Sequence, residues 1–369
     1  MNNNHKTIDW EFVEDKLYHY RKDWNHVQSA LPAMRKIVNL CEQEGATLLA
    51  HYYQLPELQY IANSAGDSLK LCLDAQKVST PYILFCGVHF MAESASILNP
   101  DKKVLLPSLE AGCSIAEGMT PDIIQHIRKS FPEAAVLAYI NTTSATKAEV
   151  DSIFTSSNAE KILNNIPNKQ VILLPDPNLS ENLFQKMKHK ISGKEVLYYK
   201  KYDFQNKFVY LRNPKLQQDI VLPFFKGQEP KTPTGACYVH EELSASPQMI
   251  EAYRQKYNPD LVIGHFEVNP ELVRGNYLSL DKIGSTTDMI RMVKDSKAKK
   301  ALMLTECHQG AAIMNEVKDV EIITPCVLCK YMKKISLDNV IESLEQKKHL
   351  ITVPEPTFSK AKRSIERMF

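Results

Sequence analysis

The sequence has no apolar run long enough to cross a membrane and no concentration of basic residues. Spanning a bilayer takes about 20 consecutive apolar residues, whereas the densest run here, residues 82–90, is interrupted by Gly87 and His89. The 45 lysines and arginines nearly balance 43 aspartates and glutamates, which leaves a formal charge of +2. No stretch reaches the basic density of a nucleic-acid binder. We therefore expect a protein that binds neither membranes nor nucleic acids.

The N-terminus also lacks the apolar core of a secretory signal peptide. Residues 1–6 are polar, and residues 10–22 carry many charges. We therefore expect a cytoplasmic protein, in which cysteines stay reduced. The eight cysteines of the chain must then be core residues, nucleophiles or metal ligands.

The cysteines fall into groups with different surroundings. Cys41, Cys72 and Cys86 lie within apolar patterns and are expected to be small, buried core residues. Four others are next to glycine, proline or turn residues, as cysteines presented by loops are: Cys113, Cys237, Cys326 and Cys329. A zinc ribbon needs two CxxC pairs, and only one is present, so structural zinc is disfavoured. An iron-sulfur cluster is compatible with long spacings, although spacing alone leaves other interpretations open.

Short apolar strands alternate with helical segments along most of the chain, which is typical of α/β proteins with parallel sheets. Three successive units are expected. Their strands are residues 45–50, 82–87 and 104–107, then 135–141, 152–155 and 171–176, and finally 261–265, 282–287 and 301–306. Because ligands bind at the carboxyl ends of strands in such sheets, the polar residues that follow each strand are candidates for one shared site.

Residues 190–234 depart from this alternation. They contain short apolar stretches near residues 198–202, 208–211 and 220–225, which we interpret as antiparallel strands of an insertion.

Two groups of polar residues at strand ends can carry chemistry. His51, Tyr53 and Ser68 could bind a phosphate or carboxylate and move protons. His265 and Glu267 are two residues apart at a strand end and point to the same face, and the segment Gly284-Ser285-Thr286 offers donors for an anion. Each group, taken singly, also fits an ordinary hydrogen-bonded turn.

Taken together, these residues resemble the quinolinate synthase family, with matching order from about residue 45 to residue 332. The motifs that carry the resemblance are His51-Tyr52-Tyr53-Gln54, Gly66-Asp67-Ser68, Phe85-Cys86-Gly87-Val88-His89-Phe90-Met91-Ala92-Glu93, Leu109-Glu110-Ala111-Gly112-Cys113-Ser114, Tyr139-Ile140-Asn141-Thr142, Thr155-Ser156-Ser157-Asn158-Ala159, Leu174-Pro175-Asp176, Cys237-Tyr238-Val239-His240, Gly284-Ser285-Thr286 and Cys329-Lys330-Tyr331-Met332.

The resemblance implies an α/β fold of three pseudo-equivalent three-layer α/β/α domains with short parallel sheets around a central active site. The expected limits are an N-terminal helical segment (1–30), a first domain (31–115, with residues 333–369 packing back on it), a second domain (116–238, including the insertion) and a third domain (239–332). Each domain would give one cysteine to a 4Fe-4S cluster. The implied ligands are Cys113, Cys237 and Cys329, and Cys329 is preferred over Cys326 because it immediately precedes the Lys330-Tyr331-Met332 segment.

The resemblance also implies an activity. A transferase of NAD biosynthesis would condense iminoaspartate with dihydroxyacetone phosphate to quinolinate, releasing phosphate and two waters, with the open iron of the cluster as a Lewis acid. An L-aspartate oxidase would supply the iminoaspartate. The implied substrate-binding residues are His51, Ser68, Tyr139, Asn141, Ser156, His265, Glu267 and Thr286. Tyr53, His51 and Glu267 are the catalytic candidates, and desolvation beside an anionic substrate is expected to raise the pKa of Glu267.

The chain departs from the family pattern in several places, which include a few extra residues between His265 and Gly284-Ser285-Thr286. It reads His265-Phe266-Glu267-Val268 where the family usually has His-Pro-Glu-Cys, it has a long insertion without the family's Trp before Cys237, and it has Thr305-Glu306-Cys307-His308 in place of a more typical Gly-Thr-Glu. Two other interpretations therefore stay open: an iron-sulfur sensor on the same scaffold, and a zinc-dependent α/β hydrolase with His and Glu ligands.

Overall fold

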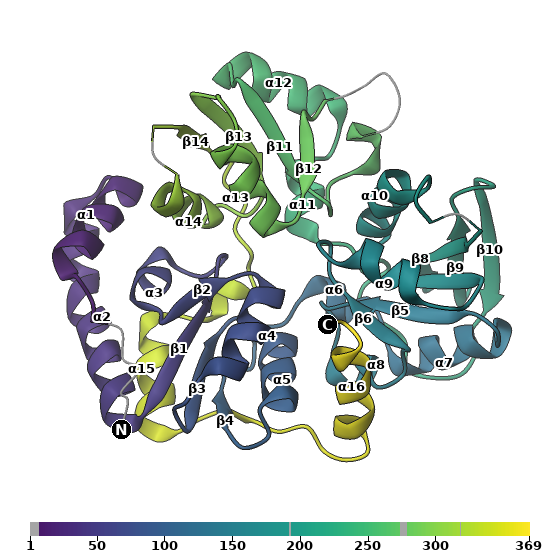
Figure 1. Ribbon diagram of the computed structural model, residues 1–369, viewed down its shortest axis with the longest axis horizontal. Coiled ribbons are helices and arrows are strands. Elements are labelled where there is room, and N and C mark those ends of the chain that lie inside the picture. Colours follow the sequence, from purple (N-terminus) through teal and green to yellow (C-terminus); the bar gives the residue numbers. More distant parts are fainter. Residues whose placement is uncertain (1–6, 192, 274–278, 318) are drawn as a thin grey trace. The chain divides into compact units, whose positions relative to one another are not determined.

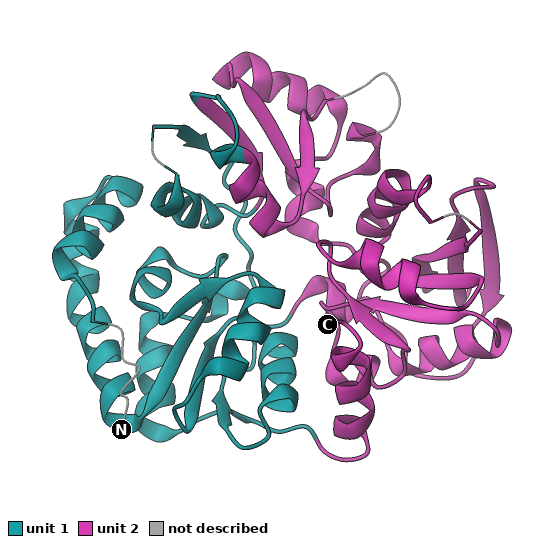
Figure 2. Ribbon diagram, in the orientation of Figure 1, with its two compact units in different colours: residues 1–112, 293–299, 306–353 teal, residues 113–292, 300–305, 354–369 magenta. Residues whose placement is uncertain are grey.

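The computed structural model describes residues 7–191, 193–273, 279–317 and 319–369. The elements that it contains are shown in Figure 1. They divide into two units, which are coloured separately in Figure 2. Unit 1 comprises residues 1–112, 293–299 and 306–353, and unit 2 comprises residues 113–292, 300–305 and 354–369.

Unit 1 is built on a mainly parallel sheet. Its strands, in spatial order, are β15 (Leu350–Ile351), β4 (Lys103–Leu105), β3 (Tyr82–Cys86), β1 (Ala46–His51) and β2 (Ser64–Gly66). Strands β1 to β4 pair in parallel, and β15 pairs with β4 in the antiparallel sense. All residues of β1 are buried, as expected for a parallel strand that is covered on both faces.

Helices cover this sheet and begin and end at recognisable signals. The long helix α2 (Trp24–Glu44) starts after Asp23, whose carboxylate accepts hydrogen bonds from the first turn, and ends at Gly45, which has a φ of +61°. Such a left-handed residue is the usual helix stop. The remaining elements of unit 1 are α1 (Trp10–Arg21), α3 (Pro56–Ile61), α4 (Ser68–Lys77), α5 (His89–Leu98), α14 (Gln309–Glu316), β14 (Glu321–Ile323), η2 (Met332–Lys334) and α15 (Leu337–Gln346).

Unit 2 contains a six-stranded sheet. The strand order is β10 (Gln218–Pro223), β9 (Phe208–Asn213), β8 (Glu195–Asp203), β7 (Gln170–Leu174), β5 (Ala135–Tyr139) and β6 (Ser152–Phe154). The antiparallel pairing of β8 with β9 and of β9 with β10 confirms the strands expected in the insertion. Because β8 also pairs with β7 in parallel, the insertion extends this sheet.

Unit 2 also holds parallel strands of the third sheet, β12 (Lys282–Gly284), β11 (Leu261–His265) and β13 (Lys300–Leu304), in that order. The predicted α/β class with three mainly parallel sheets is thereby confirmed. The other elements of unit 2 are α6 (Ser114–Glu117), α7 (Pro121–Ser130), α8 (Ser144–Lys147), α9 (Ala159–Asn165), α10 (Pro177–Met187), α11 (Tyr238–Leu243), α12 (Pro247–Tyr257), η1 (Pro270–Leu272), α13 (Thr286–Lys294) and α16 (Thr357–Glu366).

The C-terminal segment divides between the two units. Helix α15 packs on α2 of unit 1, whereas α16 packs on α8 and β6 of unit 2. The domain limits expected from the sequence stay a prediction. Within the described ranges, no helix is long and apolar enough to cross a membrane.

Candidate functional site

Three of the predicted site residues lie at the carboxyl ends of neighbouring strands of unit 1. His51 is the last residue of β1 and is paired in register with Gly66, the last residue of β2. Its Nδ1 accepts a hydrogen bond from the backbone N–H of Tyr53 at 3.0 Å, and the two rings meet edge to face with centroids 4.7 Å apart. Ser68 begins α4, directly after β2. The local fold therefore brings the first predicted group to one sheet edge.

A second set lies at the carboxyl ends of β5 and β6 in unit 2. Tyr139, the last residue of β5, is paired in register with Phe154, the last residue of β6. The backbone N–H of Ile140 donates to Phe154 at 2.9 Å, which extends this pairing beyond the strand. Asn141 and Ser156 follow these two strand ends, and β5 ends two residues earlier than the expected strand 135–141.

A third set follows β11 and β12, also in unit 2. His265 ends β11 opposite Gly284 of β12, and the N–H of Phe266 donates to the Gly284 carbonyl at 3.1 Å. Thr286 is the first residue of α13 and is buried. Because His265 and Glu267 are also almost fully buried, these polar groups must be satisfied by partners within the protein.

Glu267 is at the centre of the polar contacts of unit 2. Its Oε2 lies 2.8 Å from Nδ1 of His240, and the ring of His240 stacks on that of His265 with centroids 4.5 Å apart. Tyr139 adds a side-chain hydrogen bond to the same carboxylate. Strand β5, strand β11 and helix α11 thus each contribute a side chain to one buried network.

In the protein itself the contacts of Glu267 lower its pKa; the rise expected beside an anionic substrate stays a prediction. Burial alone raises the pKa of this carboxyl, but His265, His240 and the hydrogen bonds from His240 and Tyr139 together lower it below its ordinary value. Burial lowers the pKa of His265 to about 4, so this imidazole is neutral at neutral pH. Glu267 is therefore a buried, hydrogen-bonded carboxylate anion, which can accept a proton.

The sequence motifs contained two further residues of this network to which we assigned no role. His240 lies on α11, three residues after Cys237, which immediately precedes the helix. This spacing brings the two residues to the same side of the helix. It was the feature of the sequence that could have identified His240 as a site residue. Asp176 caps α10 by accepting the N–H of Leu179 at 3.0 Å and is fully buried. Burial, and then the charge of Glu267, raise the pKa of Asp176 well above its usual range, whereas the contacts of Glu267 lower the pKa of Glu267.

The loops that carry Cys113 and Cys237 pack closely in unit 2. Each cysteine immediately precedes a short helix, α6 and α11 respectively, and is half-buried. The hydroxyl of Ser114 donates to the Ala236 carbonyl at 3.0 Å. The backbones flanking the two cysteines are therefore in direct contact.

Gly118 allows this close approach. A Cβ atom built on it would lie 2.4 Å from the Cα of Gly235, so Gly118→Ala must push the two loops apart. We expect a loss of about 1–3 kcal/mol in the free energy of unfolding, measured by urea denaturation of the reduced, metal-free protein. In Gly310→Ala the new Cβ meets Thr324 at an ordinary 3.4 Å, and that variant should match the parent or exceed it. Equal stability of both variants would contradict the account.

Cys329 lies in unit 1, in the loop between β14 and η2, and is also half-buried. Cys326, its CxxC partner, is joined to Cys307 by a disulfide, with the two Cα atoms 4.8 Å apart. The expectation that all cysteines stay reduced is therefore wrong for this pair. The physical reason is that the turn before α14 and the loop after β14 lie side by side, with the N–H of Cys307 donating to Val327 at 3.3 Å.

The cysteines outside the disulfide fall into two groups that differ in burial, as expected. Cys41, Cys72 and Cys86 are buried in the core, which confirms their predicted role, whereas Cys113, Cys237 and Cys329 are the half-buried ones. Cysteine thiolates on loops are the donors that iron-sulfur clusters use. In their chemistry, the three half-buried cysteines fit such a cluster. Another donor group lies within unit 2, where atoms of Cys237, His240 and Glu267 are all within 4.8 Å of one another.

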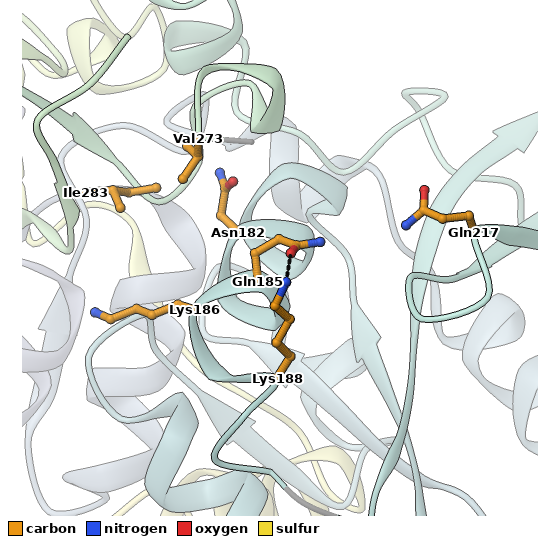
Figure 3. A pocket seen from close by; sticks show the side chains of 7 residues that line it. All are labelled: Asn182, Gln185, Lys186, Lys188, Gln217, Val273 and Ile283. Atoms are coloured by element: carbon orange, nitrogen blue, oxygen red, sulfur yellow. Dashed lines mark hydrogen bonds between the residues drawn. The ribbon is translucent and has the colours of Figure 1, made fainter. Parts of the chain in front are cut away.

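Unit 2 also has a pocket of about 640 Å³ (Figure 3). It is lined by Asn182, Gln185, Lys186, Lys188, Gln217, Val273 and Ile283. Four of these side chains come from α10 and the residue after it, and Lys188 donates to Gln185 at 3.0 Å. None of the seven was predicted as a site residue, but the pocket adjoins the ends of β11 and β12, because Asn182 donates to the carbonyls of Phe266 and Val268 at 2.9 Å and 2.8 Å and Ile283 belongs to β12.

Comparison with known proteins connects these residues to one family. The family model described as Quinolinate synthetase A protein matches residues 35–369. The quinolinate synthase of Sinorhizobium fredii is 32% identical over 339 residues, covering 91% of this chain and 82% of that protein. Quinolinate synthase 2 of Mesorhizobium japonicum is 34% identical, covering 90% and 89%, and the Thermus thermophilus quinolinate synthase is 32% identical, covering 90% and 96%.

The similarity therefore extends well beyond the individual motifs. It includes the strand ends of both units, the three half-buried cysteines and the buried network around Glu267, all of which lie within the matched residues. By its sequence, the chain belongs to the quinolinate synthase family of enzymes.

Proposed function

We propose that this chain condenses iminoaspartate with dihydroxyacetone phosphate to form quinolinate, phosphate and two waters, as a step of NAD biosynthesis. Family membership supports the proposal most strongly. Within the structure, the observation that carries it is the division of the cysteines, because Cys113, Cys237 and Cys329 are half-buried on loops while the other cysteines are either in the core or in the disulfide.

In this proposal Cys113, Cys237 and Cys329 hold a 4Fe-4S cluster. Three thiolates leave one iron of such a cluster open, and an open iron supplies Lewis acidity toward a substrate oxygen. The contact between Ser114 and Ala236 supports the joint use of Cys113 and Cys237. Cys329 is the third ligand because its CxxC partner Cys326 is occupied by Cys307.

The two substrates are anions, and the polar residues at the strand ends are suited to bind them. Ser68 and Thr286 are the first residues of α4 and α13, where helix N–H groups and hydroxyls favour phosphate or carboxylate. We assign substrate contacts to His51, Asn141, Ser156 and His265 as well, which offer imidazole, amide and hydroxyl donors.

Proton transfer in this mechanism is assigned to Glu267, with Tyr53 and His51 as further candidates. Ring closure removes protons from the carbon and nitrogen atoms that become part of the pyridine ring. Glu267 is suited to accept one of them because it is nearly completely buried and because Tyr139 and His240 fix its carboxylate. The ring of His265, which stacks on the ring of His240, is neutral. It can donate a hydrogen bond to a substrate carboxylate.

An isotope experiment tests the proposed reaction. Iminoaspartate is generated anaerobically from ¹⁵N-aspartate by an L-aspartate oxidase, the class of enzyme expected to supply it, and is mixed with ¹³C-labelled dihydroxyacetone phosphate and the purified protein. Mass spectrometry should detect quinolinate that carries both labels, and no product when either substrate is left out. A protein with an intact cluster that makes no quinolinate would instead support the sensor interpretation.

A further inference from the structure

Glu306 is a buried carboxylate that the proposed reaction does not use. It follows β13 in the sequence, belongs to unit 1 and has no solvent exposure. Its Oε2 accepts the backbone N–H of His308 at 2.7 Å, and its Oε1 accepts the backbone N–H of Cys329 at 3.2 Å. One carboxylate therefore fixes the backbone of a proposed cluster ligand.

Lys333 completes this arrangement from the other side. Its ammonium group lies 3.0 Å from Oε1 of Glu306 and also donates to the backbone carbonyl of Tyr53 at 2.5 Å. Its own N–H donates to the carbonyl of Cys329 at 3.1 Å, which closes the turn between the two residues. The side chain is only 18% exposed. The ion pair thus connects the loop of Cys329 to the loop that carries His51 and Tyr53.

Buried amides support the same two loops. The side-chain N–H₂ of Gln59 donates to the carbonyls of Tyr52 and Gln54 at 2.8 Å and to that of His308 at 3.1 Å. The side chain of Gln54 reaches the Sδ of Met332 at 3.4 Å. These contacts, all within unit 1, hold the segment after β1 against His308, which precedes α14, and against Met332, which follows β14.

A buried ion pair by itself usually adds little to the stability of the folded protein. The cost of removing two charges from water can exceed their attraction, and well-packed apolar residues often stabilise equally well. What such a pair does provide is a fixed geometry for the groups that it bonds. Here those groups are the backbone of Cys329 and the backbone of Tyr53.

We propose that Glu306 and Lys333 are positioning residues, which hold the Cys329 and Tyr53 loops of unit 1 in the arrangement that receives the cluster and the substrates. The proposal rests on the proposed function, in which Cys329 is a ligand. The positive charge of Lys333 also offsets the carboxylate, so that a ligand thiolate is not left beside an uncompensated negative charge. Residues that hold a metal ligand in place commonly change metal affinity by about 10–100-fold.

Three variants test the pair: Glu306→Gln, Lys333→Met and the double variant. The matched control is Lys334→Met, because Lys334 is the next residue and forms an exposed ion pair of 2.8 Å with Glu110. After anaerobic reconstitution, the rate at which a chelator removes iron should rise by about 10–100-fold in both single variants and stay at the parental value in the control. In the double variant the rate of iron removal should rise by less than the two single increases combined, because neither charge is buried without its partner.

Two further readouts separate positioning from a general structural role. The electron paramagnetic resonance spectrum of the reduced cluster should change in the single variants, and Lys333→Arg should restore part of the parental chelator resistance. In the reduced, metal-free proteins, alkylation of Cys329, followed by mass spectrometry, should be several-fold faster in Glu306→Gln and Lys333→Met than in the parent or in Lys334→Met. Variants that only unfold at a lower temperature, with parental spectra and alkylation rates in the folded protein, would overturn the proposal.

The alkylation experiment also distinguishes a failure of this inference from a failure of the proposed function. A parent protein that takes up no cluster would contradict the cluster assignment, while faster alkylation of Cys329 in the two variants would still show that the pair orders this loop. A clustered, active parent with variants that match it in every readout would contradict the positioning role alone.

Discussion

Cys329→Ser should produce a folded protein that loses its iron, its sulfide and its quinolinate synthesis together. A serine hydroxyl is not deprotonated at neutral pH and is a poor ligand for cluster iron, whereas thiolates are the usual ligands. The same loss is expected for Cys113→Ser and Cys237→Ser, since each would leave the cluster with two thiolates. Iron and sulfide analysis, visible absorption and the product assay on anaerobically purified variants measure the effect.

Cys326→Ser is the matched control for this series. It removes the other cysteine of the CxxC pair, whose sulfur is bonded to Cys307, and should retain the cluster and most of the activity. Loss of the cluster in Cys326→Ser with retention in Cys329→Ser would show that the assignment of the third ligand is reversed. Retention in all four variants would contradict a three-cysteine cluster.

Glu267→Gln should lower kcat by about 10²–10⁴-fold, the usual contribution of a general base, while the iron and sulfide contents stay at the parental values. The substitution keeps the size of the side chain and removes the negative charge that His240 and Tyr139 stabilise. Steady-state kinetics on protein with a measured iron content separates this loss of turnover from a loss of cluster.

Glu271→Gln is the control for Glu267, because Glu271 is an exposed glutamate on η1, four residues later in the chain. It should have parental kinetics. Normal turnover of Glu267→Gln with an intact cluster would remove Glu267 from the mechanism. A loss of iron in that variant would instead assign the carboxylate to metal binding, together with Cys237 and His240.

The sequence was sufficient to assign most of the fold because buried parallel strands are short apolar runs with polar residues at their ends. Residues 45–50 and 135–141 were expected as strands and correspond to β1 and β5. Most of the predicted site residues lie at or just after strand ends, and their roles stay predictions. The pattern did not reveal that β8 extends the sheet of β7, because a strand's partner depends on contacts that a local pattern does not contain.

For the cysteines too, the local sequence pattern indicated burial but not which distant residue each one contacts. Apolar surroundings identified Cys41, Cys72 and Cys86 as core residues, because burial follows the local pattern. The bond between Cys307 and Cys326, which are 19 residues apart, depends on how α14 and β14 pack and has no signal in the spacing. The ion pair of Glu306 and Lys333 was missed for the same reason.

The protonation of Glu267 could not be predicted because burial and hydrogen bonding act in opposite directions. From the sequence we expected a raised pKa only for a carboxylate that is desolvated beside an anionic substrate. The opposing contacts come from Tyr139, 128 residues earlier, and from His240 on α11. Only the tertiary structure shows that the contacts outweigh the burial.

The most direct test of the account is the metal and sulfide content of the parent protein, purified without oxygen, together with quinolinate formation by the same sample. We predict about four irons and four sulfides per chain, a brown protein and quinolinate that appears only when both substrates are present. Zinc without sulfide would contradict the cluster and favour the hydrolase interpretation, and a full cluster without turnover would contradict the proposed reaction.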